Sequence, residues 1–225
     1  MTWSLGELEA LARKAARGAG MSWGMAEEAG CAARWLCAAG LPGGESLADL
    51  LAWAEGRDWA DLRPESNAGG GRWRARGPRL CPIATGTALC DAAGSIGPAL
   101  ALGPVAQPLL LAPFAAWAAE ARATPSALSW PGARLRFGPG GALIEAEGGA
   151  ALRARHAAKA ALGDDPEAAS GAASGPGSPA LAGATRAEIG PAAARILQAF
   201  AARTYAPETA ERRLAGAGAG LADQD

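Results

Sequence analysis

Apolar positions recur at helical spacing through residues 1–56. Leucines at every third position follow the capping box Ser4-x-x-Glu7, which predicts a helix that ends around residues 18–20. The same periodicity predicts a second helix over about 23–39, stopped by glycine and proline, and a third over 46–56. The sequence therefore predicts an N-terminal three-helix unit.

The pattern then changes, and residues 57–162 are expected to be mainly strands. Alternating apolar and polar residues predict a hairpin in which 128–137 and 142–147 pair around the glycines of 138–141. One helix, 113–122, interrupts the strands and is opened by its proline. Further short strands are expected at 79–89 and 108–111, whereas 151–162 fits a strand and a helix equally well.

The remaining residues divide into a polar segment and a helical end. Residues 163–183 carry few large apolar side chains and are expected to be disordered. Pro191 then opens a helix with an apolar face, and Pro207 is expected to start another that Gly216 ends. Together the elements predict one α+β domain: the helical unit packs on a small, mostly antiparallel sheet, and 184–225 adds C-terminal helices and a glycine-rich tail.

Composition narrows the class of protein without indicating a reaction. The chain has 225 residues and a formal net charge of -1, with arginine largely replacing lysine. It therefore has no overall field that would attract nucleic acid or an anionic membrane. The longest apolar run is broken by prolines, and the first residues lack the pattern of a signal peptide. We therefore expect a cytoplasmic protein that does not enter the membrane.

The four cysteines and the single histidine argue against several common catalytic sites. No C-x-x-C spacing is present, so the cysteines are expected to be buried thiols rather than zinc ligands. No G-x-S-x-G motif accompanies His156, which argues against a serine hydrolase. No set of metal ligands is predicted, and the sequence leaves the cofactor unknown.

Two stretches near the ends of the chain carry a resemblance to a known family. Residues 15–30 read AARGAGMSWGMAEEAG and are followed by Arg34-Trp35-Leu36, and Thr204-Tyr205-Ala-Pro207 precedes the final Gly-Ala-Gly-Ala-Gly. With these motifs the chain resembles an uncharacterised group of proteobacterial proteins, the family of the domain of unknown function 3726. The resemblance implies that these two ends define the group, and it implies no reaction.

The junction of the first two helices gathers residues suited to a small-molecule site. Glu27 and Glu28 lie in the first turns of the second helix, where acids stabilise the helix dipole. The alternative is that one of them, beside Trp23, is a base with a raised pKa. Arg17 could hold a carboxylate or phosphate with two parallel hydrogen bonds, although exposed arginines are more often simply solvated. A pocket lined by Arg17, Glu28 and Tyr205 would favour a ligand site.

The glycine-rich tail allows two interpretations. In one, Gly216 ends a helix and the following residues fray, as most termini do. In the other, residues 216–220 lie against the second helix, and Asp223 or Asp225 contributes a carboxylate that could serve Mg²⁺. The tail residues of this second interpretation are Arg212, which would hold an anion, Gly216, Gly218, Gly220 and Asp223.

The favoured function is an enzyme or a binding protein for a small anionic metabolite. A second hypothesis is a non-catalytic accessory or assembly partner of a metabolic enzyme that uses a flat patch of Trp35, Leu36 and Trp53. The possible partners are another protein or a second copy of the chain. A third is a single-stranded nucleic-acid binder through the arginines of 72–79, in which an expected strand over 72–76 puts three arginines on one face and Trp73 on the other. The acidic pI and the absence of a known nucleic-acid motif argue against the third hypothesis.

Overall fold

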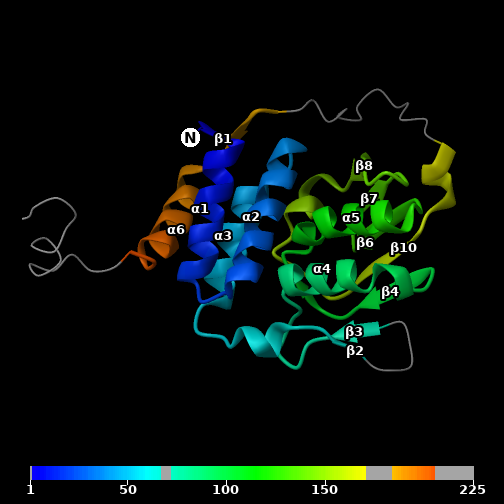
Figure 1. Ribbon diagram of the computed structural model, residues 1–225, viewed down its shortest axis with the longest axis horizontal. Coiled ribbons are helices and arrows are strands. Elements are labelled where there is room, and N and C mark those ends of the chain that lie inside the picture. Colours follow the sequence, from blue (N-terminus) through cyan, green and yellow to red (C-terminus); the bar gives the residue numbers. More distant parts are fainter. Residues whose placement is uncertain (1, 67–71, 171–183, 206–225) are drawn as a thin grey trace, which may run out of the picture.

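The computed structural model describes residues 2–66, 72–170 and 184–205, and it confirms the α+β class. The helices are α1 (Leu5–Gly18), α2 (Trp23–Ala38), α3 (Gly43–Ala54), α4 (Pro82–Asp91), α5 (Ala112–Arg122) and α6 (Pro191–Ala202). The strands are β1 (Thr2–Ser4), β2 (Glu65–Ser66), β3 (Arg72–Arg74), β4 (Ala99–Leu102), β5 (Val105–Ala106), β6 (Ser126–Trp130), β7 (Ala133–Phe137), β8 (Leu143–Glu147), β9 (His156–Ala157), β10 (Ala160–Asp164) and β11 (Arg186–Glu188). Figure 1 shows a helical bundle beside a sheet, and α4 and α5 lie next to that sheet.

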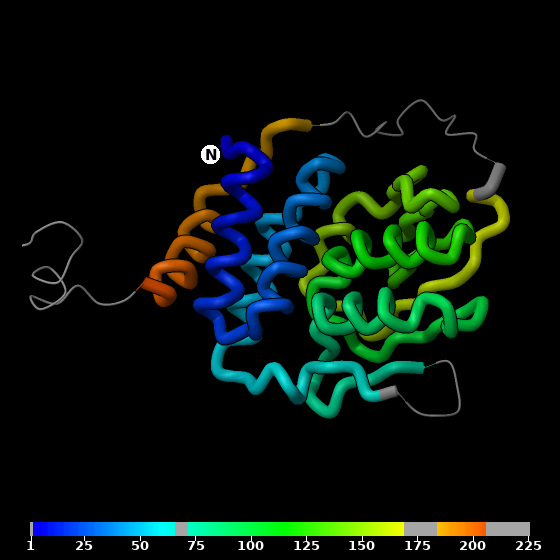
Figure 2. The backbone as a smooth tube through the Cα atoms, viewed as in Figure 1, coloured from blue at the N-terminus to red at the C-terminus, as the bar shows by residue number. Residues whose placement is uncertain are grey.

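The N-terminal three-helix unit forms as predicted. The hydroxyl of Ser4 accepts a hydrogen bond from the backbone N–H of Glu7, whose carboxylate accepts one from the N–H of Ser4, so the predicted capping box is complete. The buried face of α2 is mostly alanine, which lets α1 approach it closely. α6 then packs against α1 and α3 and makes the unit a four-helix bundle, as the tube in Figure 2 shows.

The contact between α1 and α6 is close enough to require a glycine. A Cβ atom at Gly18 would lie 1.8 Å from the backbone oxygen of Phe200, so no side chain fits there without separating the helices. Residues far apart in the sequence are thereby held together at the ends of α1 and α6.

The larger sheet has seven described strands in the order β2-β3-β4-β10-β6-β7-β8. Its pairs are antiparallel except for β3 and β4, which run parallel. The predicted hairpin around residues 138–141 is confirmed as β7 and β8. The single strand expected over 128–137 is instead two strands, β6 and β7, because Gly132 at a φ of +83° reverses the chain between them.

Two segments expected to be strands are helical. Most of 79–89 belongs to α4, where Pro82 occupies the first turn and needs no partner for a backbone N–H. Residues 108–111 form a 3-10 turn, entered through Gln107 at a φ of +44°, that leads directly into α5. Short apolar runs fit a buried strand and a buried helix equally well, and here the prolines start helices. The region 57–162 therefore contains two helices besides its strands.

Two boundaries also differ from the prediction, and the structure decides the form of 151–162, which the sequence left open. α3 begins at Gly43, and Ser46 lies buried inside it instead of capping it. Gly43 permits this earlier start because its backbone lies against α2, where a Cβ would be 2.3 Å from the backbone oxygen of Ala33. β3 ends at Arg74 rather than at residue 76, and 151–162 forms a 3-10 turn followed by β9 and β10.

The first part of the segment expected to be disordered is ordered. Gly163 and Asp164 end β10, and residues 166–170 form a 3-10 turn. Residues 171–183 and 206–225 lie outside the described residues, and so do the helix expected at Pro207 and the glycine-rich tail.

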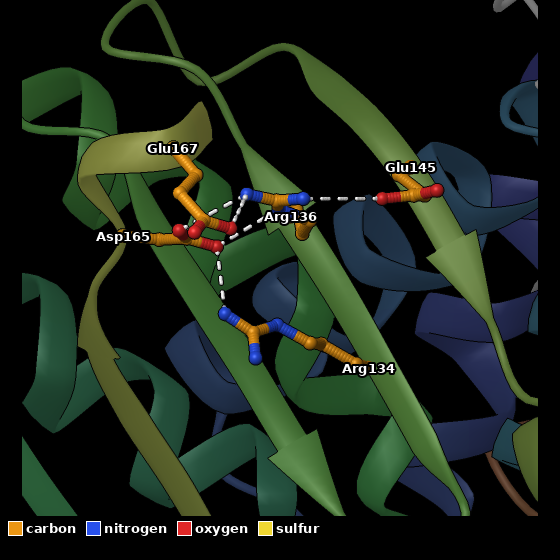
Figure 3. A network of polar contacts seen from close by, with 5 residues as sticks. All are labelled: Arg134, Arg136, Glu145, Asp165 and Glu167. Atoms are coloured by element: carbon orange, nitrogen blue, oxygen red, sulfur yellow. Dashed lines mark hydrogen bonds and ion pairs between the residues drawn. The ribbon is translucent and has the colours of Figure 1, made fainter. Parts of the chain in front are cut away.

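A network of charged side chains holds residues 165–167 against the sheet (Figure 3). Asp165 has a side chain only 4% exposed and accepts hydrogen bonds from Arg134 at 2.9 Å and from Arg136 at 2.9 and 3.1 Å. Arg136 also forms ion pairs with Glu145 and Glu167. Burial by itself would raise the pKa of Asp165, but the hydrogen bonds from the two arginines outweigh burial and hold that pKa below its usual value. The network therefore stabilises the start of the segment with charged hydrogen bonds.

Candidate functional site

A groove of about 720 Å³ opens between the C-terminal half of α1, the start of α2 and the end of α6. Its volume lies in the range typical of small-molecule sites. The close contact at Gly18 brings the two helix ends together here. The groove is lined by Arg13, Lys14, Arg17, Gly18, Gly20, Trp23, Glu27, Arg203 and Thr204.

Positive charge predominates in the groove. Among the described residues, four of its lining side chains are cationic and one is acidic. The acid, Glu27, accepts hydrogen bonds from Arg13 at 3.1 and 3.4 Å, so this pair is neutral as a unit. The remaining excess is notable in a chain whose formal net charge is -1. An anion entering the groove would therefore meet a local field that the whole chain does not have.

Arg17 and Trp23 contact each other in the groove lining. The guanidinium of Arg17 lies over the indole of Trp23, 4.4 Å from the ring centroid, and donates a hydrogen bond to the backbone oxygen of Met21. These contacts fix the direction of the Arg17 side chain. Its planar guanidinium carries five N–H groups, so it keeps donors for a further acceptor.

A second cation and ring meet at the end of α6. The ammonium of Lys14 lies 5.6 Å from the centroid of Tyr205, the last described residue. Arg203 pairs with Glu55 at 2.7 Å, and both side chains are about half exposed, so water screens this pair strongly. The residues that follow α6 thus contribute the cation of Arg203 to the groove lining, and the ring of Tyr205 lies beside it.

Glu28 lies in a different cavity from Glu27. This second cavity, of about 430 Å³, opens between the start of α2 and α4, and Asp91 and Arg63 line it with Glu28. Burial, and then the charge of Asp91, raise the pKa of Glu28. Of the two acids, Glu28 is thus the one with a raised pKa, and it lies away from Arg17.

The structure brings together part of the predicted site. Arg17, Trp23 and Glu27 line one groove, and Tyr205 lies beside it through Lys14. The expected pocket of Arg17, Glu28 and Tyr205 does not form, because Glu28 lines the other cavity. The tail residues of the prediction, Arg212, Gly216, Gly218, Gly220 and Asp223, lie outside the described residues.

Sequence reasoning missed Lys14 and Arg203. Lys14 could have been found, because residues three apart on a helix share a face and Arg17 was already a candidate. Arg203 gave no such signal, since only the packing of α6 on α1 brings it to this groove.

The apolar patch that the accessory-protein hypothesis requires differs from its predicted form. Leu36 is fully buried, and Trp35 is partly buried with its ring 6.5 Å from that of Phe137, so these residues do not form a flat exposed patch. Trp53 is also partly buried and carries the guanidinium groups of Arg57 and Arg79 over its ring.

The arginines of 72–79, which the nucleic-acid hypothesis requires on one surface, have different surroundings. Arg76 pairs with Asp61 at 3.3 Å and with Glu65 at 3.8 Å, and Arg79 faces Trp53. Arg72 and Arg74 remain exposed on β3.

The described residues offer little for metal or thiol chemistry. Within them, no three histidine, cysteine or acidic side chains gather as metal ligands would, and all four cysteines are free thiols. Burial raises the pKa of Cys81 and Cys90 to about 11, so both are protonated at neutral pH. Over the same ranges no helix has the length and apolar composition that a bilayer-spanning segment requires.

Residues 3–77 match the sequence model of the family described as protein of unknown function (DUF3726), which confirms the predicted resemblance over that range. The matched range contains α1, α2 and α3 and ends well before α6, so it covers Arg17, Trp23 and Glu27 but not Tyr205. No curated protein and no solved structure matches the chain. The family's description states no activity, so the function is argued from the site.

Proposed function

We propose that the chain binds a small anionic metabolite in the groove between α1, α2 and α6. The observation that carries this proposal is the convergence, among the described residues, of four cationic side chains from α1 and the end of α6 on a groove with one acid. Arginine and lysine are the residues that hold carboxylates and phosphates in proteins. Glu27 offsets the charge of Arg13, and Glu55 offsets that of Arg203. Lys14 and Arg17 have no acidic partner among the described residues, so an anion would lower the repulsion between them.

Lys14 and Arg17 would make the principal contacts. Both lie on α1, three residues apart, so they project from the same face of the helix. Arg17 would offer two parallel hydrogen bonds and Lys14 a compact point charge. Arg203 would add a third cation from α6, at the cost of weakening its exposed pair with Glu55.

Binding, rather than catalysis, is the function that the groove supports. Its one carboxylate, Glu27, already accepts hydrogen bonds from Arg13 and is therefore a poor general base. Glu28, whose pKa is raised, lines the other cavity with Asp91. The proposal accordingly assigns no bond-making step to either acid.

Isothermal calorimetry with phosphorylated and carboxylated metabolites tests this proposal. The ionic strength is held constant with sodium chloride, because salt screens the charges that attract the ligand and so changes the measured affinity. Replacing Arg17 with glutamine, or Lys14 with glutamine, should weaken binding about tenfold or more, since a hydrogen bond to a charged group contributes about 1.5–3 kcal/mol. Affinity should also fall as salt rises.

The matched control is Arg34→Gln. Arg34 is an exposed arginine of α2 that pairs with Glu9 at 3.2 Å, and it does not line the groove, yet the substitution changes the net charge by the same amount. It should leave the affinity unchanged within about twofold, because exposed ion pairs contribute little. Equal losses in Arg17→Gln and Arg34→Gln would show a general charge effect and would contradict a site in the groove.

A further inference from the structure

Trp23 is the one tryptophan of this chain that does not belong to the core. All eight tryptophans lie in the described residues. Trp130 is buried, and six others are partly buried against the core: Trp3, Trp35, Trp53, Trp59, Trp73 and Trp117. Trp23 is 70% exposed. A large apolar ring left in water gives up the burial energy that its seven counterparts gain, so folding alone does not account for its position.

The indole of Trp23 is nevertheless held in a defined position. Arg17 covers one face of the ring at 4.4 Å, and the groove begins beside it. An indole has two faces, and the high exposure of Trp23 leaves the other one uncovered. A ring that already lies in place loses little conformational freedom when a second ring stacks on it.

The size of the groove also exceeds the need of a simple anion. About 720 Å³ can hold a ligand of drug-like size, whereas phosphate or a short carboxylate would fill only a small part of it. The cations and the ring line the same space, so one ligand can contact both.

From these observations, and resting on the proposed function, we infer that the ligand is a small anion that carries a planar conjugated ring. The ring stacks on the free face of Trp23, and the phosphate or carboxylate lies against Lys14, Arg17 and Arg203. A nucleoside monophosphate and an aromatic carboxylate share this chemistry. Single-stranded nucleic acid would use the same kinds of side chain, but it needs successive rings along a strand. Among the described residues Trp23 is the one ring in the groove lining, and the exposed Tyr205 lies beside the groove rather than in it.

Two matched pairs of probes test the inference on the full chain by calorimetry. Adenosine monophosphate is compared with ribose 5-phosphate, which lacks the base, and benzoate is compared with cyclohexanecarboxylate, which lacks the planar ring. In at least one pair the ring compound should bind about tenfold more tightly, because stacking on an aromatic side chain contributes about 1–3 kcal/mol, or roughly 5- to 150-fold.

Substitution of Trp23 assigns the difference to the indole. Trp23→Leu should remove the preference for the ring compound, whereas Trp23→Phe should keep most of it, because phenylalanine still presents a π face. The ratio of the two affinities is the decisive value, since loss of the indole also frees Arg17 and weakens every anion alike.

The outcomes separate the two proposals. Equal affinity within both pairs, together with sensitivity to Arg17→Gln, would overturn the ring inference and leave anion binding intact. No binding of any of the four probes at millimolar concentration would overturn both. A ring preference that survives in Trp23→Leu, or an oligonucleotide that binds more tightly than the monophosphate, would also overturn the inference.

Discussion

Replacing Asp165 with asparagine should destabilise the protein by about 2–3 kcal/mol. The carboxylate is 4% exposed and accepts three hydrogen bonds from Arg134 and Arg136. A hydrogen bond to a charged group contributes about 1.5–3 kcal/mol, and removing one partner of a buried ion pair costs about 3–5 kcal/mol. We expect a loss in the first of these two ranges, because Arg134 is half exposed and Arg136 keeps its pair with Glu145, so neither cation is left buried and alone.

Urea denaturation at neutral pH and a thermal melt measure this loss. For a chain of this length, 1 kcal/mol corresponds to about 2–4 °C, so the melting temperature should fall by about 5–10 °C. The matched control is Glu147→Gln, which removes one negative charge from an exposed position on β8 of the same sheet. It should change stability by less than about 0.5 kcal/mol.

The pH dependence gives a second, independent test. The pKa of Asp165 is held below its ordinary value of 3.8, so its contribution is present above that value and is lost as the pH falls through the lower, folded-state pKa. The difference between wild type and Asp165→Asn should therefore be constant above about pH 5 and should shrink in more acidic solution. A variant as stable as the wild type at pH 7, or a difference that grows in acid, would refute the assignment of this network.

Three further predictions follow from other parts of the chain. Gly18→Ala should destabilise the protein by about 1–3 kcal/mol in urea denaturation, because its Cβ would meet the backbone of Phe200. The control Gly24→Ala, where nothing lies within 4 Å of the added Cβ, should be neutral or slightly stabilising. Equal effects of the two substitutions would contradict the packing of α1 on α6. The Glu28 carboxyl should titrate above 4.5 in a carbon-detected NMR experiment, and Asp91→Asn should move its midpoint down; such a raised pKa makes the folded state relatively less stable as pH rises through it. Deleting residues 206–225 tests the sequence-based prediction that the tail contributes to the site: ligand affinity should drop tenfold or more at unchanged helix content by circular dichroism, and full affinity in the truncated chain would count against Arg212 and Asp223.

The parts of the fold that follow from local sequence were predictable. α1 and α2 begin within a residue or two of their expected positions, because serine caps and helical periodicity act within a few residues. The hairpin of β7 and β8 was found for the same reason, through glycines at its turn. Local signals failed at α4 and at 108–111, where apolar runs without a clear period are compatible with either structure.

The candidate site was only partly accessible to sequence reasoning. Arg17, Trp23 and Glu27 lie within eleven consecutive residues, so their proximity could be inferred from the junction of two helices. Which acid faces the groove could not, because Glu27 and Glu28 point about 100° apart and only the packing of α4 shows that Glu28 faces Asp91.

The sequence by itself determined the α+β class, the three N-terminal helices and the presence of Arg17 and Trp23 near the first helix junction. These features depend on capping, periodicity and closeness along the chain. The tertiary structure decided that α6 packs on α1 through Gly18 and brings Arg203 and Tyr205 to Lys14 and Arg17. Contacts between residues nearly 190 positions apart carry no periodic signature, because they arise only when the whole apolar core is buried at once.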